Sequence, residues 1–175
     1  MTRAEPVGLP AQPFRVSFVC TGNICRSPMA EVVLRDLATQ AGLERALRVD
    51  SAGTGDWHVG ERADHRTIAA LERAGYDGSR HRARQFEPEW FRELDLVVAF
   101  DRGQARILRN WAHHSGELDK VRLLLEFEPE PTSLVDVPDP YYSDDAMFDR
   151  VLEMIERSTT ALFRQLAPAL RQGIR

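Results

Sequence analysis

The chain has 175 residues, of which 43% are hydrophobic and 29% are charged. These proportions are typical of a globular domain and exclude a disordered, collagen-like or coiled-coil chain. The formal net charge is -4, so charge alone gives no support for nucleic-acid binding. Because no apolar run is long enough to cross a membrane and residues 1–13 lack the apolar centre of a secretory signal, we expect a cytoplasmic protein without membrane insertion. Export without a signal peptide stays open.

The first predicted elements form a strand, a loop and a helix. Residues 15–20 are a short apolar run typical of a buried strand. After the loop, apolar residues recur at helical spacing as far as Ala41, and Gly42 ends the pattern. We expect Ser27 to cap this helix and Pro28 to be its first residue.

Strand and helix patterns continue to alternate along the rest of the chain. Strands are predicted at 47–50, 96–100 and 121–125, and helices at 64–74, 101–111 and 145–170. This order predicts a single α/β domain over residues 14–175, with a mainly parallel four-stranded sheet and helices on both faces. Residues 1–13, rich in proline and alanine, are expected to be a flexible tail. Ligands of such sheets bind beyond the carboxyl ends of the strands, so the loop after the first strand is the predicted site.

This loop has the composition of a phosphate-binding loop. Gly22 and Asn23 tolerate left-handed backbone, which lets successive N–H groups point inward beside a helix N-terminus. An anion is stabilised there, and the same field favours the thiolate form of Cys20. Arg26 adds a planar fork that matches two phosphate oxygens. The sequence therefore predicts a nucleophile and an anion clamp within one loop.

Cys20 and Cys25 are the only cysteines of the sequence. Two thiols five residues apart cannot form a disulfide framework, and without further ligands they make a poor zinc site. Cys25 has two interpretations that stay open at this point. It is either a packing residue or the partner of Cys20 in a reversible disulfide that protects the nucleophile from irreversible oxidation.

Asp139 precedes Pro140, which restricts it to an extended conformation. An aspartate before a proline is usually a turn residue, so these two residues by themselves assign it no catalytic role.

The stretch Val19–Pro28 resembles the phosphate loop of the low-molecular-weight protein tyrosine phosphatases of the bacterial type. Further matches follow in that family's order: Asp50–Thr54, Trp57 with Gly60, Asp64 with Arg66, His81–Gln85 and Asp139–Tyr142. The resemblance covers nearly the whole chain, residues 14–170. It implies a protein tyrosine phosphatase that uses neither a metal nor a cofactor and acts on a phosphotyrosine-containing protein.

The resemblance also implies a role for each matched residue. Cys20 is the nucleophile, Arg26 clamps the phosphate, and Asp139 is the general acid that later activates water. The phosphate loop and its supporting residues are Thr21, Gly22, Asn23, Ile24, Cys25, Ser27, Ser51 and His81, and Ser27 is expected to donate its hydroxyl to the Cys20 sulfur. Trp57, Tyr141 and Tyr142 are expected to form the walls of the substrate cleft. The two tyrosines could also pair between molecules, so we expect a monomer or a weak dimer.

Other acidic and histidine residues are expected to have no metal role. Asp136, Asp144, Asp145 and Asp149 lack the glycine and terminal glutamate of a calcium loop, so we interpret them as solvated charges and a helix N-terminus. His113 and His114 are predicted to point apart on a helix. Asp101 matches an acidic position of the family and is expected to be structural.

Three alternative functions follow from the same loop. An arsenate reductase of this fold needs two further cysteines, which the chain lacks. An arginine phosphatase has a threonine where this chain has Ile24. A phosphotyrosine-binding module without catalysis is the third alternative, and only a measurement of phosphate release would separate it from an enzyme.

Overall fold

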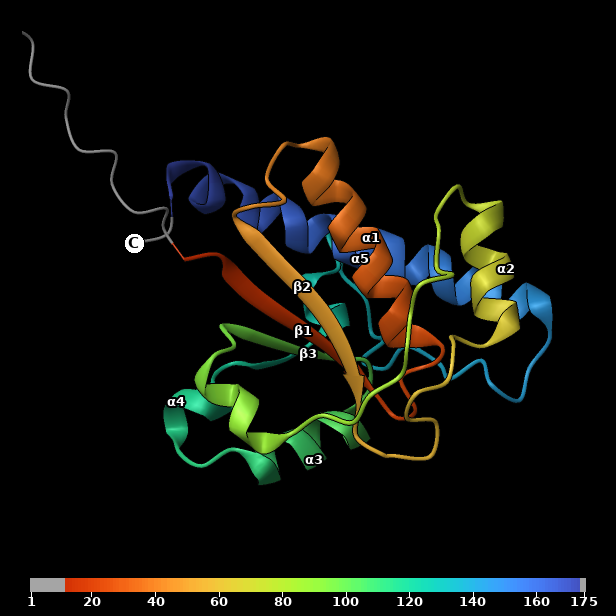
Figure 1. The fold of residues 1–175 in the computed structure, drawn as a ribbon, viewed down its shortest axis with the longest axis horizontal. Coiled ribbons are helices and arrows are strands. Elements are labelled where there is room, and N and C mark those ends of the chain that lie inside the picture. Colours follow the sequence, from red (N-terminus) through yellow and green to blue (C-terminus); the bar gives the residue numbers. More distant parts are fainter. Residues whose placement is uncertain (1–11, 174–175) are drawn as a thin grey trace, which may run out of the picture.

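A four-stranded parallel sheet forms the centre of the computed structural model, which describes residues 12–173 (Figure 1). Its strands are β1 (Phe14–Cys20), β2 (Leu47–Gly53), β3 (Leu96–Ala99) and β4 (Val121–Leu123). They lie in the order β2-β1-β3-β4, and each neighbouring pair is parallel. The predicted α/β fold with a four-stranded sheet is confirmed. The predicted flexible tail, apart from Gln12 and Pro13, lies outside the described residues.

Helices cover both faces of this sheet (Figure 1). One face carries α1 (Arg26–Gln40), α2 (His65–Arg73) and α5 (Asp145–Gln172), and the other carries α3 (Arg102–Trp111) and the 3-10 helix η1 (Pro88–Arg92). Successive residues of a strand point to opposite faces. Phe18 accordingly packs in the core under α1 and α5, whereas Val19 packs in the core that contains Phe91 and Leu108. The central strand is therefore buried on both sides, as its apolar sequence predicts.

Several boundaries differ from the sequence prediction. The helix α1 begins at Arg26, with Cys25 as its cap residue and no side-chain cap, so the expected cap at Ser27 is wrong. The predicted strand 121–125 ends at Leu123 and continues as the 3-10 helix η2 (Leu124–Phe127). The short helices η1, η2 and α4 (Ser115–Leu118) have too few residues to produce a periodic pattern.

The strand order places the loop after β1 at the point where the order of the strands reverses. The chain runs from β1 outward to β2 and then returns to β3 on the other side of β1. Cys20 ends β1, and Asp101 follows β3 as the cap of α3, so both lie at the same edge of the sheet. This edge is the predicted ligand site of a doubly wound sheet. Within residues 12–173, no helix has both the length and the apolar character needed to cross a membrane.

Candidate active site

The loop between β1 and α1 comprises residues 21–25 and is fixed by backbone hydrogen bonds. The N–H of Thr54 donates to Cys20 O (2.8 Å), that of Gly55 to Thr21 O (3.0 Å), and that of Asp64 to Ile24 O (2.9 Å). Gly53 lies directly against this loop, because a Cβ atom there would be 2.6 Å from the carbonyl oxygen of Thr21. The strand β2 therefore supports the loop through backbone contacts that leave no space for a side chain.

Asn23 is the residue about which the loop is organised. It is fully buried and, among the described residues, it is the only one besides glycine with a positive φ, 56°. Asparagine tolerates this left-handed conformation better than most residues. Its side-chain amide donates to Ser27 Oγ (2.8 Å) and Ser51 Oγ (2.9 Å), its Oδ1 accepts from Arg84 N (2.9 Å), and its carbonyl oxygen is 2.6 Å from His81 Nε2. The conformation of the loop is thus held from four sides.

The Cys20 sulfur lies 2.9 Å from the Ser27 hydroxyl, and both side chains are buried. Ser27 lies in the first turn of α1, where it reaches back to the end of β1. A hydroxyl at this distance can donate to a thiolate and stabilise its negative charge. This contact also explains why Ser27 does not cap the helix, since its oxygen is shared between Cys20 and Asn23.

Cys25 is buried near Cys20 and is not bridged to it in this structure. Burial, and then the nearby Cys20 sulfur, raise the pKa of the Cys25 thiol from 9.0 to about 12. A thiol with this pKa stays protonated at neutral pH and is a poor nucleophile. Of the two thiols, Cys25 is therefore the unreactive one in this reduced form.

Arg26 directs its guanidinium group toward two acidic residues that are far away in sequence. Its Nη1 donates to Asp101 Oδ2 (2.9 Å) and to the carbonyl oxygen of Val137 (3.0 Å), and its Nη2 lies 3.5 Å from Asp139 Oδ2. Only 3% of the Arg26 side chain is exposed. Because these contacts come from two separate loops, the planar group has a fixed orientation at the mouth of the phosphate loop.

Asp139 lies on the loop that precedes α5, and half of its side chain is exposed. Its Oδ1 accepts a hydrogen bond from Tyr141 N (3.1 Å), so the carboxyl group is oriented by its own loop. The other oxygen faces Arg26. A carboxyl group held in this way is accessible to a bound ligand and to water.

A pocket of about 420 Å³ joins these residues. It is lined by Cys20, Thr21, Gly22, Ile24, Cys25, Arg26, Trp57, His58, Asp139, Tyr141 and Tyr142. Trp57 and Tyr142 are strongly exposed, at 69% and 96%, and form the outer rim rather than the floor. The rings of Tyr141 and Tyr142 pack edge to face with centroids 4.9 Å apart. The pocket thus has a floor formed by the loop and Arg26 and walls that carry aromatic side chains.

Two residues near this pocket were not predicted to contribute. His58 lines the wall beside Tyr141, with ring centroids 6.2 Å apart. Arg66 holds the rim, because its guanidinium lies over the Tyr141 ring and donates to the carbonyl oxygen of Ser143 (3.1 Å). Asp64 binds the same guanidinium. Burial would raise the pKa of Asp64, but the hydrogen bonds and charge of Arg66 outweigh it and lower that pKa.

Ser51 and His81, which were predicted to support the loop, share a third partner that the sequence did not reveal. The Glu31 carboxylate accepts from Ser51 Oγ, lies 3.7 Å from His81 Nδ1 and pairs with Arg35 (2.6 Å). Burial alone would raise the pKa of Glu31, but the contacts with His81, Ser51 and Arg35 lower it below its usual value of 4.5. Glu31 lies on α1 shortly after the phosphate loop, and no sequence pattern singles it out, because its partners Ser51 and His81 come from distant parts of the chain.

Asp101 has more contacts than a helix cap requires. It caps α3 together with Gln104 in a reciprocal arrangement, and it also binds Arg26. Gln104 in turn donates to Thr21 Oγ1 (3.1 Å), so the start of α3 contacts the phosphate loop directly. The Asp-x-x-Gln spacing predicts the cap. The contacts with Thr21 and Arg26 form because β1 and β3 are neighbours in the sheet. The spacing of residues in the sequence does not reveal this strand order.

The remaining acidic and histidine residues differ in part from their predictions. Asp144 caps α5, as expected, whereas Asp136 pairs with Arg102 (3.1 Å) and Asp149 pairs with Arg73 (2.7 Å). The prediction that His113 and His114 point apart on a helix is wrong. Both follow the end of α3, and their rings approach the buried carboxylate of Glu117 at 2.9 and 3.6 Å. Within the described part of the chain, no group of three or more His, Cys, Asp or Glu side chains is arranged so that it could hold a metal ion.

Comparison with known sequences shows similarity to one family. Residues 15–172 match the family model described as low molecular weight phosphotyrosine protein phosphatase. A protein of Streptomyces coelicolor named low molecular weight protein-tyrosine-phosphatase is 53% identical over 150 residues, which cover 85% of this chain and 91% of the relative. The low molecular weight protein-tyrosine phosphatase A of Mycobacterium bovis is 46% identical over 153 residues, or 87% and 91% of the two chains.

Comparison with solved structures gives the same result. The crystal structure of YfkJ from Bacillus subtilis matches with a TM-score of 0.82 and 36% identity, and covers 89% of this chain and 96% of its own. A protein tyrosine phosphatase from Entamoeba histolytica, crystallised with Hepes in its active site, matches with a TM-score of 0.83 and 29% identity, covering 89% and 98%. The chain therefore belongs to the low molecular weight protein-tyrosine-phosphatase family.

Proposed function

We propose that the protein hydrolyses phosphotyrosine in protein substrates through a phosphocysteine intermediate on Cys20. The observation that carries this proposal is the convergence of Cys20, Arg26 and Asp139 on one pocket with a fixed anion-binding loop. Membership of a tyrosine phosphatase family supports the reaction class.

In the first step, the Cys20 thiolate attacks phosphorus while the bond from phosphorus to the tyrosine oxygen breaks. The proton of the Asp139 carboxyl group passes to that oxygen, so tyrosine leaves as a neutral phenol. Arg26 holds two of the non-bridging oxygens, and the loop N–H groups and the α1 N-terminus stabilise the negative charge. Asp101 keeps the guanidinium plane in position during this step.

In the second step, a water oxygen attacks phosphorus and the sulfur–phosphorus bond breaks. The Asp139 carboxylate takes a proton from that water, and the electron pair of the broken bond returns to sulfur. Ser27 lies 2.9 Å from Cys20 and donates its hydroxyl to the departing thiolate. The second step regenerates the Cys20 thiolate and the protonated Asp139 carboxyl group. Arg26 and the loop N–H groups stabilise the negative charge on the phosphoryl group, so no metal or cofactor enters the scheme.

The walls of the pocket favour tyrosine over serine as the phosphorylated residue. Tyr141, Tyr142 and Trp57 can pack against an aromatic ring that extends from the floor to the rim. A phosphoserine side chain is shorter and has no ring for these walls to contact. We place this activity in the cytoplasm, where the Cys20 thiol stays reduced, and in a monomer or weak dimer.

Phosphate release from a tyrosine phosphopeptide, measured in the presence of a chelator, tests this function. We expect release by the parent protein and by Cys25→Ser, and none by Cys20→Ser. The Cys25→Ser variant is the matched control, since it removes the neighbouring buried thiol by the same substitution. Binding of the peptide without release by the parent would show a recognition module instead. Activity that requires added magnesium would contradict the metal-free mechanism.

A further inference from the structure

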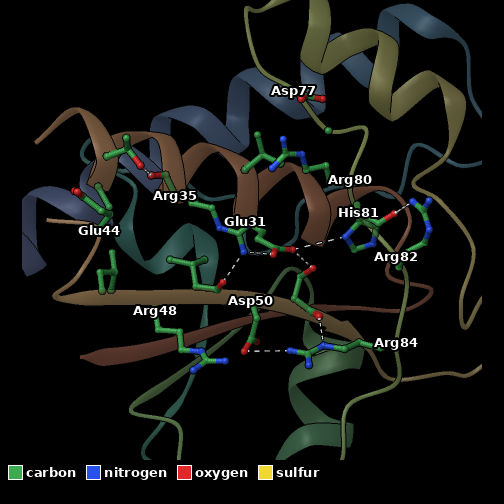
Figure 2. Close-up of a pocket in the computed structure, with 17 residues that line it drawn as sticks. Glu31, Arg35, Glu44, Arg48, Asp50, Asp77, Arg80, His81, Arg82 and Arg84 are labelled. Carbon is green, nitrogen blue, oxygen red and sulfur yellow. Dashed lines mark hydrogen bonds and ion pairs between the residues drawn. The ribbon is translucent and has the colours of Figure 1, made fainter. Parts of the chain in front are cut away.

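A second pocket, of about 740 Å³, lies behind the phosphate loop (Figure 2). It is a groove between α1, the outer edge of β2 and the segment 77–84, and we call it the rear pocket. Its volume is in the range of small-molecule sites and exceeds that of the pocket around Cys20. Cys20, Arg26 and Asp139 do not line it.

The rear pocket is rich in arginine although the chain as a whole is acidic. Its lining includes Arg35, Arg48, Arg80, Arg82 and Arg84. Figure 2 shows Arg35 extending from α1 toward β2, and Arg80 lying over α1 from the opposite wall. Within residues 12–173, Arg48 and Arg80 form no ion pair. Guanidinium groups on facing walls are suited to phosphate groups, which they bind in a bidentate manner.

Four carboxylates also line the rear pocket, and their positions limit where an anion can bind. Glu31 is neutralised by Arg35 (2.6 Å), and Asp50 by Arg84 (3.1 Å). Figure 2 shows Glu44 and Asp77 at the margins, away from the pair formed by Glu31 and Arg35. The pKa of Asp77 is lowered first by its hydrogen bonds with Ser79 and then by the charge of Arg80, so this carboxylate lies within reach of the Arg80 charge. An anion between Arg35 and Arg80 therefore has to compete with Glu31 for one guanidinium and with Asp77 for the other.

The inner wall of the rear pocket is continuous with the support of the phosphate loop. Ser51 accepts from Asn23 and donates to Glu31, and His81 contacts the Asn23 carbonyl oxygen at 2.6 Å. Asn23 donates to Ser27, whose hydroxyl lies against the Cys20 sulfur. A displacement of Arg35 from Glu31 would therefore act on a chain of hydrogen bonds that ends at the nucleophile.

We propose that the rear pocket binds a small molecule with two or more phosphate groups, and that this binding lowers turnover through the contacts of Asn23. Arg35 and Arg80 are the principal ligands, with His81 beside them. Bound phosphate competes with Glu31 for the Arg35 guanidinium. The Glu31 carboxylate then loses its counter-ion, and its hydrogen bonds with Ser51 and His81 rearrange.

Nuclear magnetic resonance titration of the full chain with methylenediphosphonate tests the binding site, because this probe carries two phosphonate groups and cannot be hydrolysed. We expect two separate sets of shifted amide signals, one at residues 21–26 and one at residues 77–84. The double variant Arg35→Ala/Arg80→Ala should weaken only the second set, by about tenfold or more. Arg109→Ala, which removes an exposed arginine of α3, is the matched control and should leave both sets unchanged.

Absence of shifts at residues 77–84, or equal shifts in the double variant, would overturn the site. Equal shifts at the same concentration of citrate would overturn the assignment to phosphate, because the groove would then respond to negative charge alone. These readouts do not use catalysis, so they stay interpretable if the proposed phosphatase activity fails.

Steady-state turnover of an aryl phosphate tests the coupling to the nucleophile. Methylenediphosphonate should raise KM through competition at the Cys20 pocket and should also lower kcat of the parent to a residual value. In the double variant, methylenediphosphonate should still raise KM but should no longer lower kcat. Both constants are compared with those of the double variant without the probe. An effect on KM alone in the parent would show that the rear pocket is not coupled to Cys20.

Discussion

Asp139 must hold a proton in one step of the proposed reaction and accept one in the next. The structure gives it two contacts, one with Tyr141 N and one with Arg26. An asparagine side chain at this position has the same shape and one acceptor oxygen, which suffices for the hydrogen bond from Tyr141 N, but its NH2 group cannot accept from Arg26 and it cannot transfer the proton. The general-acid role can therefore be separated from the positioning of the loop.

The substitution Asp139→Asn should have an effect that depends on the leaving group. For an aryl phosphate with a poor leaving group, we expect a loss of about 10²- to 10⁴-fold in kcat/KM, because the departing oxygen is not protonated. For one with a good leaving group the loss in kcat/KM should be much smaller. The measurement is kcat/KM across a series of aryl phosphates, and equal losses along the series would exclude Asp139 as the acid.

The two thiols should differ sharply in reactivity. The pKa of Cys25 is raised to about 12, first by burial and then by the neighbouring sulfur of Cys20, so Cys25 stays a thiol at neutral pH. We expect limited iodoacetamide treatment at neutral pH to alkylate Cys20 and leave Cys25 unmodified, as read by peptide mass spectrometry. Preferential alkylation of Cys25 in the folded protein would contradict this account.

The short elements and loops meet at one end of the sheet, and glycine at position 53 is part of that junction. The backbone of β2 ends against Thr21 and Asn23, with no space for a Cβ atom between them. Earlier in the same strand, Arg35 donates a hydrogen bond to Val49 O (2.8 Å) and Arg84 donates one to Ser51 O (3.0 Å). These side chains satisfy carbonyl groups on the outer edge of β2 and protect that edge from pairing with another chain.

The substitution Gly53→Ala should displace the phosphate loop. Its Cβ would lie 2.6 Å from Thr21 O and 3.2 Å from Asn23 N, both backbone atoms that cannot move alone. We expect a destabilisation of about 1–3 kcal/mol by urea unfolding, together with a reduced kcat. Gly116→Ala is the control, because its Cβ meets only the His114 ring, at 3.2 Å. Unchanged activity of Gly53→Ala would show that the loop tolerates a shift of β2.

A strand or helix could be predicted where its sequence signal lies within the element itself. The apolar runs and helical spacing locate all four strands and the four longer helices, and the loop composition locates Cys20 and Arg26. The start of α1 was misplaced because the Ser27 hydroxyl contacts Cys20 and Asn23 instead of the helix N-terminus. The bonding of His113 and His114 to Glu117 could not be predicted because Glu117 lies on α4, whose four residues are too few to produce a periodic pattern.

At the scale of the whole molecule, the Glu31 carboxylate contributes to folding stability and also supports the residues that hold the active-site loop. This carboxylate joins α1, β2 and the segment 77–84, and its partners include the residues that hold Asn23. The sequence could not identify it, since Arg35, Ser51 and His81 come together only when the chain has folded. The contact of Asp101 with Arg26 could not be predicted for the same reason, because it joins the loop after β3 to the loop after β1.

Glu31 should contribute to the pH dependence of unfolding. Its pKa in the folded protein lies below the usual 4.5, despite burial, because His81, Ser51 and Arg35 favour the charged form. Folding stability from this group is therefore fully present above pH 4.5 and is lost as the pH falls through the lower, folded-state pKa. We expect Glu31→Gln to be less stable than the parent at pH 7 and to lose less stability below pH 4.5, as measured by urea unfolding. A parallel decrease in both proteins would contradict this assignment.

The covalent intermediate on Cys20 is the central claim, and mass spectrometry of rapidly quenched Asp139→Asn tests it most directly. An aryl phosphate with a good leaving group should phosphorylate this variant without an acid, while the second step stalls because no base activates water. The account predicts intact protein that carries one added phosphoryl group, located on Cys20 by peptide mapping, and no added mass when Cys20→Ser is combined with Asp139→Asn. Release of the phenol with no phosphorylated protein, or a phosphoryl group on another residue, would contradict the mechanism.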